Sequence, residues 1–185
     1  MTSIEIKREN IIFDPKVQTY CNNPRFKCPN YGHSWACPPE APYSDEILSK
    51  YTQFYLIYKK YDLKDYIKDK KSKFPKRSDE KIINAFYREN FMRDWIEEDI
   101  RKFIKKFEGK FEEIFILWDG HCRVCEKVQK TCTYDEGVAC RYPNDLHYSM
   151  EAVGINVTET VKNLNLDIQW PPRDHAYRFS LICLK

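Results

Sequence analysis

The 185-residue sequence has little of what several common protein classes require. It contains only five glycines and ten prolines, which argues against a flexible low-complexity chain and against a collagen-like one. No apolar run approaches the roughly 18 to 20 residues that span a bilayer. Its 31 basic residues barely exceed its 28 acidic ones, and a dedicated nucleic-acid-binding domain needs a stronger basic excess. We therefore expect no nucleic-acid partner and no membrane partner.

The signatures of several enzyme classes are also missing. The sequence has no G-x-x-x-x-G-K-[ST], no G-x-G-x-x-G, no H-E-x-x-H and no G-x-S-x-G. The Cys-x3-Cys-x2-Cys spacing that radical SAM enzymes use is absent too. The first residues, MTSIEIKREN, are polar and lack the apolar segment of a secretory signal, so we expect a cytoplasmic protein. Whether the protein is an enzyme stays open.

Cysteine is the residue that stands out. Seven of the eight cysteines fall into two groups, one at Cys21, Cys28 and Cys37 and the other at Cys122, Cys125, Cys132 and Cys140. In a cytosolic chain thiols stay reduced, and clustered cysteines then indicate metal or redox ligands. The neighbours of these seven are mostly polar residues and prolines. Cys183 differs, because the surrounding FSLICL is typical of a buried core strand.

The second group has the spacing Cys-x2-Cys-x6-Cys-x7-Cys. Four thiolates bind either zinc or an iron–sulfur cluster. Structural zinc sites usually combine two Cys-x-x-Cys pairs, whereas this group has one pair and two separate cysteines. A proline, Pro143, follows the last cysteine as in bacterial ferredoxin loops. The pattern therefore favours a 4Fe–4S cluster over zinc, with a redox dithiol at Cys122 and Cys125 as a third reading.

The first group has only three cysteines. Three thiolates can hold a 4Fe–4S cluster and leave one iron open for water, a substrate or another ligand such as His33. Alternatively, His33 completes a Cys3His zinc site, Cys183 supplies a fourth thiolate, or no metal binds. Near the two groups, the sequence offers basic residues that would offset the charge of a cluster (Arg123, Lys127, Lys130 and Arg141). It also offers one carboxylate, Glu151, that is either a helix-terminal charge or a functional group.

Hydrophobic patterning and turn residues predict the secondary structure. We expect helices at 44–50, 78–107 and 158–164, strands at 53–61, 111–118, 167–170 and 177–184, and a charged, solvated connector at 59–81. Two cysteine-rich loops, 21–43 and 119–149, would carry the metal sites. The order of elements predicts one α+β domain over 1–185, a small sandwich with a mostly antiparallel sheet and helices on one face.

Several strings together resemble a known family. They are CPNYGHSWACPP at 28–39, the Cys122-x2-Cys125 pair, Cys140 with Pro143, and SMEAVGINV at 149–157. They resemble the prokaryotic predicted metal-binding proteins of domain of unknown function 2284, over nearly the whole chain from residue 21 to 184. The resemblance implies a soluble iron–sulfur or metal-binding protein without an assigned reaction.

The sequence thus predicts a cytosolic iron–sulfur protein with two 4Fe–4S clusters and an electron-transfer or redox role beside a redox partner protein. Two alternatives remain. One is a zinc-stapled structural or adaptor protein, in which the 59–81 segment docks a partner. The other is an enzyme that uses the open iron as a Lewis acid on a small sulfur- or oxygen-containing substrate. The oligomeric state is not encoded in any of these patterns.

Overall fold

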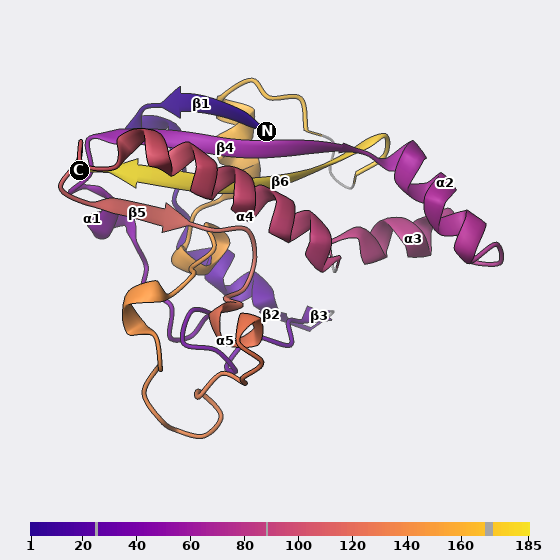
Figure 1. Ribbon diagram of the computed structural model, residues 1–185, viewed down its shortest axis with the longest axis horizontal. Coiled ribbons are helices and arrows are strands. Elements are labelled where there is room, and N and C mark those ends of the chain that lie inside the picture. The colour runs from indigo at the N-terminus through magenta and orange to yellow at the C-terminus, as the bar shows by residue number, and fades with distance from the viewer. Residues whose placement is uncertain (25, 88, 169–171) are drawn as a thin grey trace.

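A four-stranded antiparallel sheet forms the centre of the molecule (Figure 1). The computed structural model describes residues 1–24, 26–87, 89–168 and 172–185. The strand order is β1 (Thr2–Ile6), β4 (Gln53–Asp62), β6 (His175–Leu184) and β5 (Ile114–Leu117). The strands β4 and β6 pair along their full length, from Gln53 opposite Leu184 to Asp62 opposite His175.

Both faces of this sheet are covered. On one face, α4 (Asn90–Ile104) packs Ile96 and Ile100 against Ile57 and Ile182. On the other face, α1 (Asp45–Leu48) and α6 (Val157–Asn163) contribute Leu48 and Val161 to a cluster with Leu56, Leu181 and Cys183. The predicted α+β class with an antiparallel sheet is confirmed. The prediction of helices on one face was wrong because consecutive residues of β4, Leu56 and Ile57, are both completely buried and need cover on both sides.

The predicted helix at 78–107 is not continuous. It consists of α3 (Asp79–Phe86) and α4, and a short 3-10 turn, Lys105–Phe107, follows α4. The guanidinium of Arg178 donates to the carbonyl oxygen of Tyr87 at 3.0 Å, just past the end of α3. That carbonyl is therefore held by a side chain from the central strand instead of continuing the helical ladder.

The charged connector at 59–81 is largely helical. It contains α2 (Leu63–Lys73), which buries only Leu63 and Tyr66 and presents most of its lysines to solvent, as a solvated helix face would, although Lys70 is 18% exposed and pairs with Glu89. Helices α2 and α3 extend beyond one end of the sheet (Figure 1). Tyr66 and Phe86 pack edge to face and hold the two helices together.

The other predicted elements agree with the structure in most places. The helices at 44–50 and 158–164 and the strands at 53–61 and 177–184 are confirmed, and the strand at 111–118 is present but shorter. Of the predicted strand at 167–170, Asp167 and Ile168 are irregular, and Gln169 and Trp170 lie outside the described residues.

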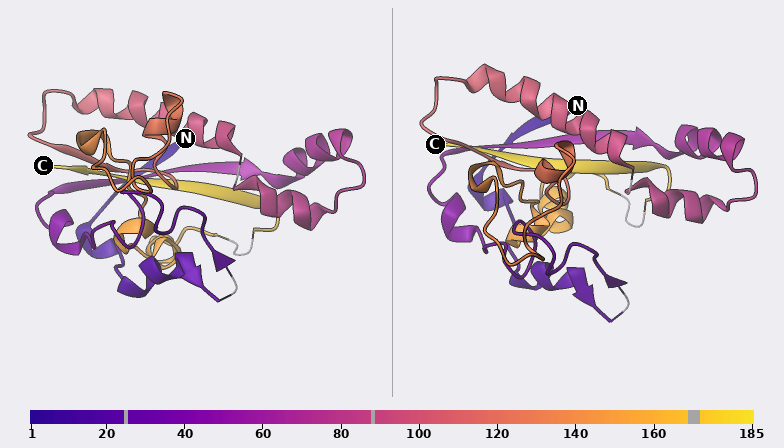
Figure 2. Two further views of the ribbon diagram at one scale, coloured as in Figure 1. Left: turned by 90° about the horizontal axis from the view of Figure 1, so that it is seen from below. Right: turned by 60° about the horizontal axis from the view of Figure 1, so that its bottom comes forward.

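The two cysteine loops lie side by side beneath the sheet (Figures 1 and 2). The first follows a 3-10 helix, Pro15–Cys21, and contains a minimal hairpin of β2 (Asn22–Asn23) and β3 (Phe26–Lys27). The second contains α5 (Val124–Lys127) and a 3-10 turn, Pro143–Asp145, and is otherwise irregular. Within the described ranges, no helix combines the length and apolar character of a membrane span.

Candidate metal centre

The four cysteines of the second group line a single cavity. Strand β5 ends at Leu117, and the chain then passes through Asp119 and Gly120 to Cys122, before α5, and to Cys125, within it. Cys132 and Cys140 come from the loop that follows. The cavity has a volume of about 60 Å³, and its wall contains Cys122, Cys125, Cys132 and Cys140. Four cysteines, two from one turn and two from the following loop, therefore border one small space.

The sulfur of Cys122 receives backbone hydrogen bonds. Burial raises the pKa of this thiol, and the neighbouring thiols Cys125 and Cys140 raise it further. The backbone N–H groups of Val124 and His147 oppose this effect by donating to the sulfur, which favours the thiolate. Hydrogen bonds of this kind to ligand sulfurs are one of the ways in which proteins set the potential of iron–sulfur clusters.

In the first group Cys37 is buried, and Cys21 and Cys28 are half-buried. The backbone N–H of Cys28 donates to the carbonyl of Cys21 at 2.8 Å, so the chain folds back on itself between these two cysteines. Burial raises the pKa of Cys37 to about 12, and Cys28 and Cys21 add to the rise. Burial and then Cys28 raise the pKa of Cys21 to about 11. Because each thiolate disfavours its neighbours, the three carry full charge together only when a cation compensates them.

Several contacts between described residues join the two loops. His33 Nδ1 lies 2.8 Å from Asp135 Oδ1, and the indole N–H of Trp35 donates to the carbonyl of Val138 at 3.2 Å. The rings of Trp35 and Tyr134 pack edge to face with centroids 4.9 Å apart. The thiol of Cys122 is also close enough to raise the pKa of Cys37. The two cysteine groups are therefore neighbours.

His33 lies at the second group's cavity. It lines that cavity together with Asn30, Ser34 and Trp35, so the first loop closes the space in which the second group's sulfurs meet. The prediction that His33 completes the three-cysteine site stays a prediction. In the described structure its Nδ1 is engaged by Asp135 and its side chain is about half exposed.

The described side chains do not form a ready-made site for a single metal ion. Among the described residues, no three His, Cys, Asp or Glu side chains are gathered closely enough to hold one metal ion. A 4Fe–4S cube is larger than one ion, so its four thiolates approach from more widely separated points.

An ionic frame fixes the start of the second loop. Asp119 is deeply buried, and its carboxylate accepts from Arg178 Nη1 at 2.5 Å. Arg93 Nη2 donates to the carbonyl oxygen of Asp119 at 2.9 Å and also bonds to that of His121. Sequence reasoning missed Arg93 and Arg178 as contributors to the site. The one available signal was the position of each arginine. Arg93 lies within a mostly apolar stripe of a helix, and Arg178 lies within a mostly apolar strand.

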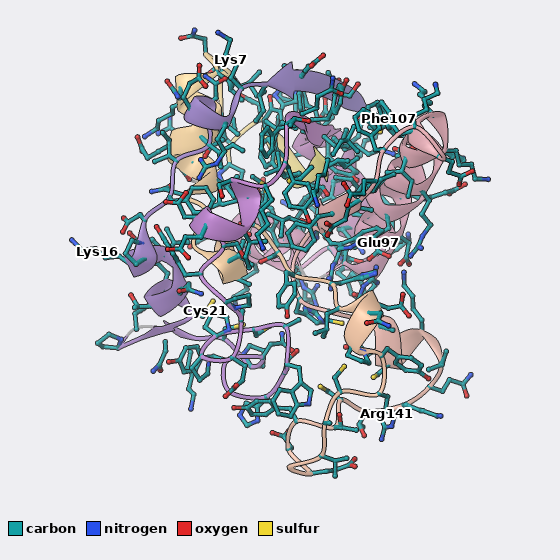
Figure 3. The ribbon with its side chains drawn as sticks, turned by 90° about the vertical axis from the view of Figure 1, so that its left-hand side faces the viewer. Lys7, Lys16, Cys21, Glu97, Phe107 and Arg141 are labelled. Carbon is teal, nitrogen blue, oxygen red and sulfur yellow. The ribbon has the colours of Figure 1, made fainter. Side chains whose placement is uncertain are left out.

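A second ionic cluster holds the Cys-x-x-Cys turn against α4. Arg123 donates to the Glu97 carboxylate at 2.5 Å, and Lys127 bonds to the other oxygen of Glu97. Figure 3 shows Glu97 on its helix and Arg141 on the cysteine loop below it, with Cys21 at the neighbouring loop. The prediction that Arg123 and Lys127 offset the charge of a cluster stays a prediction, and in the structure both side chains pair with Glu97 and anchor the loop.

His147 is part of the interior and not a surface residue. Its ring stacks on Trp118, with centroids 4.1 Å apart and planes 11° apart. Burial lowers the pKa of His147 to about 4. The stack holds the end of the second loop against the residue that follows β5, and it positions the His147 backbone N–H toward the Cys122 sulfur.

Comparisons with known proteins agree with this chemistry. Neither the curated proteins nor the solved structures include a match to this chain. The profile of a family described as "Predicted metal-binding protein (DUF2284)" matches residues 4–184. That match includes both cysteine loops and all of the sheet except the first two residues of β1, and the chain therefore belongs to the DUF2284 family of predicted metal-binding proteins.

Proposed function

We propose that this protein is a cytoplasmic iron–sulfur protein that binds two 4Fe–4S clusters and transfers electrons to or from a redox partner protein. The observation that carries the proposal is the cavity lined by all four cysteines of the second group and closed by the first loop. Cys122, Cys125, Cys132 and Cys140 would hold one cluster. Cys21, Cys28 and Cys37 would hold the other.

The surroundings of the second group support a cluster. The sulfurs come from a helical turn and two loop positions, and Cys122 accepts backbone hydrogen bonds from Val124 and His147. When bound, such a cluster supplies one-electron transfer. The protein's own contribution is to hold the ligands rigidly, through the Glu97 and Asp119 ion pairs, and to keep the cluster partly shielded from water.

The neighbouring positions of the two groups support an exchange of electrons between them. Cys37 belongs to the first group and Cys122 to the second, and their thiols influence one another's charge. A cluster with three thiolates would have one open iron. This favours a second function for the first site, namely Lewis-acid chemistry on a small molecule, because a cavity of about 260 Å³ includes Glu151, a residue that also influences the Cys21 thiol.

Anaerobic purification followed by metal and sulfide analysis tests the proposal. We expect a brown protein with broad absorption near 400 nm, roughly eight irons and eight sulfides per chain, and an EPR signal after reduction. A colourless protein with stoichiometric zinc would overturn the proposal in favour of a zinc-stapled adaptor. A metal-free protein whose Cys122 and Cys125 form a reversible disulfide would favour the dithiol reading.

A further inference from the structure

A second cavity opens where β5 ends. In the register of the sheet, β5 pairs only with Leu181 to Leu184, so the described β5 does not reach the preceding half of β6. The cavity of about 260 Å³ lies along that half. Its wall is formed by Tyr87, Asp119, Glu151, Val157, Thr158, Val161, Ile168, Tyr177, Arg178 and Phe179.

One carboxylate in this cavity has no counter-charge. Asp119 and Arg178 neutralise each other through their 2.5 Å contact. Glu151 accepts a hydrogen bond from the Ser149 hydroxyl, but no lysine, arginine or histidine among the described residues lies within ion-pair distance of it. The side chain is reachable from solvent yet enclosed by protein, an arrangement that raises the pKa of Glu151. An enclosed carboxylate without a partner favours a ligand that brings a positive charge.

The remaining wall suits an organic cation. Tyr177 and Phe179 stack with ring centroids 6.0 Å apart and planes 15° apart, and Val157, Val161 and Ile168 complete an apolar side. Aromatic faces attract ammonium groups, whereas Ca²⁺ or Mg²⁺ would require six or more oxygen ligands. The volume is just below the roughly 300–1,000 Å³ of pockets for drug-sized ligands, which restricts the ligand to a small molecule.

We propose that this cavity binds a small organic ammonium compound, with Glu151 pairing to the ammonium group and Tyr177 and Phe179 contacting an aromatic or aliphatic body. The site adjoins the first cysteine group. Gln18, in the 3-10 helix that ends at Cys21, donates to the carbonyl of Ala152 at 2.8 Å, directly after Glu151. The inference does not depend on which metal the cysteines bind, so it and the proposed function fail separately.

Binding of three matched probes tests the charge requirement. Phenethylamine, 2-phenylethanol and 3-phenylpropanoate share a phenyl body and carry a positive, a neutral and a negative end. We expect isothermal titration of the full-length, anaerobically purified protein to give saturable binding of phenethylamine, at least tenfold weaker binding of the alcohol and none of the carboxylate. Equal affinity for amine and alcohol, or no amine binding, would overturn the proposal.

Substitutions in and near the cavity test where phenethylamine binds. Glu151→Gln should weaken phenethylamine binding at least tenfold, whereas Glu159→Gln, at an exposed position of α6 that pairs with Lys162, should leave it unchanged. Thr158 lines the cavity at an exposed position, so Thr158→Phe should fill the space and abolish binding without disturbing the core. Undiminished binding in Thr158→Phe places the amine elsewhere and refutes the proposal, even where Glu151→Gln fails to fold.

Discussion

Arg123 donates to Glu97 across 2.5 Å, and the two side chains are only 5% and 3% exposed. Glu97 belongs to the long helix α4, and Arg123 directly follows Cys122. The pair therefore links the helix that covers the sheet to the loop that presents the second group of thiols. Arg123 also pairs with Asp94 at 2.8 Å and Glu97 also pairs with Lys127, so the two buried charges form the centre of a small ionic network.

The first prediction is that Glu97→Gln lowers the free energy of unfolding by about 3 to 5 kcal/mol, because it breaks the buried ion pair with Arg123, whose other partner, Asp94, is 55% exposed. Chemical denaturation at pH 7 measures this loss. Glu98→Gln is the matched control: Glu98 is the next residue, its side chain is 62% exposed and it pairs with Lys102. The control should lose less than about 1 kcal/mol. Equal losses in the two variants would contradict an anchoring role for Glu97.

Glu97 also makes the folding stability of the protein depend on pH. Burial alone would raise the pKa of Glu97, but hydrogen bonds from Lys127 and Arg123 outweigh it and hold the pKa below its ordinary value of 4.5. As the pH falls, Glu97 is therefore protonated at a higher pH in the unfolded chain than in the folded protein. The stabilisation by Glu97 is present above pH 4.5 and is lost as the pH falls through the lower folded value.

Denaturation curves of the unmodified protein and of Glu97→Gln between pH 3 and pH 7 check this sign. The difference in stability should be constant near neutrality and should shrink below about pH 4.5. A difference that grows on acidification would mean that the pKa of Glu97 is raised in the folded protein.

Cysteine substitutions separate ligands from core residues. Cys140→Ser should remove about half of the bound iron and sulfide, since one of two proposed clusters loses a ligand. Cys183→Ala should retain the full amount, because Cys183 lies completely buried in β6 and packs in the sheet core. Metal analysis of the two variants side by side gives the answer. Loss of iron from Cys183→Ala would instead identify Cys183 as the fourth thiolate of the first group.

The contact between the loops yields a prediction about a residue that is not a ligand. Trp35→Ala removes the hydrogen bond to Val138 and the ring contact with Tyr134, so the second loop should open more often. We expect metal to transfer to a chelator several-fold faster than from the unmodified protein. Trp95→Ala, on the exposed side of α4 at 49% exposure, should release metal at the unmodified rate. Identical release rates for both variants would show that the loops hold their ligands independently.

Two glycines with similar backbone angles provide a packing test. Gly154 has φ +89°, and a Cβ there would overlap the ring of Tyr43, whereas Gly137 has φ +66° and open space around it. Gly137→Ala should cost about 1 to 2 kcal/mol of folding stability from the backbone alone. Gly154→Ala should cost more, because the Tyr43 ring must also move. Thermal unfolding compares them, and equal costs would show that Tyr43 does not press on this turn.

Much of the fold follows from local pattern. The aromatic, β-prone residues of β4 and the apolar β6 predicted the two central strands, and the Ser78 cap predicted the start of α3. The break between α3 and α4 could not be predicted, because it depends on Arg178, which lies about ninety residues later in the sequence. A hydrogen bond between residues so far apart produces no periodic pattern in the sequence.

The candidate site, like the fold, could be predicted from the sequence only in part. Spacing alone grouped Cys122, Cys125, Cys132 and Cys140, and the structure lines one cavity with all four. The sequence contained no information that Arg123 would pair with Glu97, because a basic residue beside cysteines suits a charged cluster equally well. Such roles depend on which element packs above the loop, and that follows only from the assembled sheet.

The strand order also determines when the molecule can assemble. Strand β6 is synthesised after every other strand, yet it lies between β4 and β5 and completes both pairings. Until residues 175–184 emerge from the ribosome, β5 has no partner and the cysteine turn beyond it has no anchored support. Arg178, which fixes Asp119, is itself part of that strand. The native support of the second cysteine loop is therefore complete only after this strand has been translated.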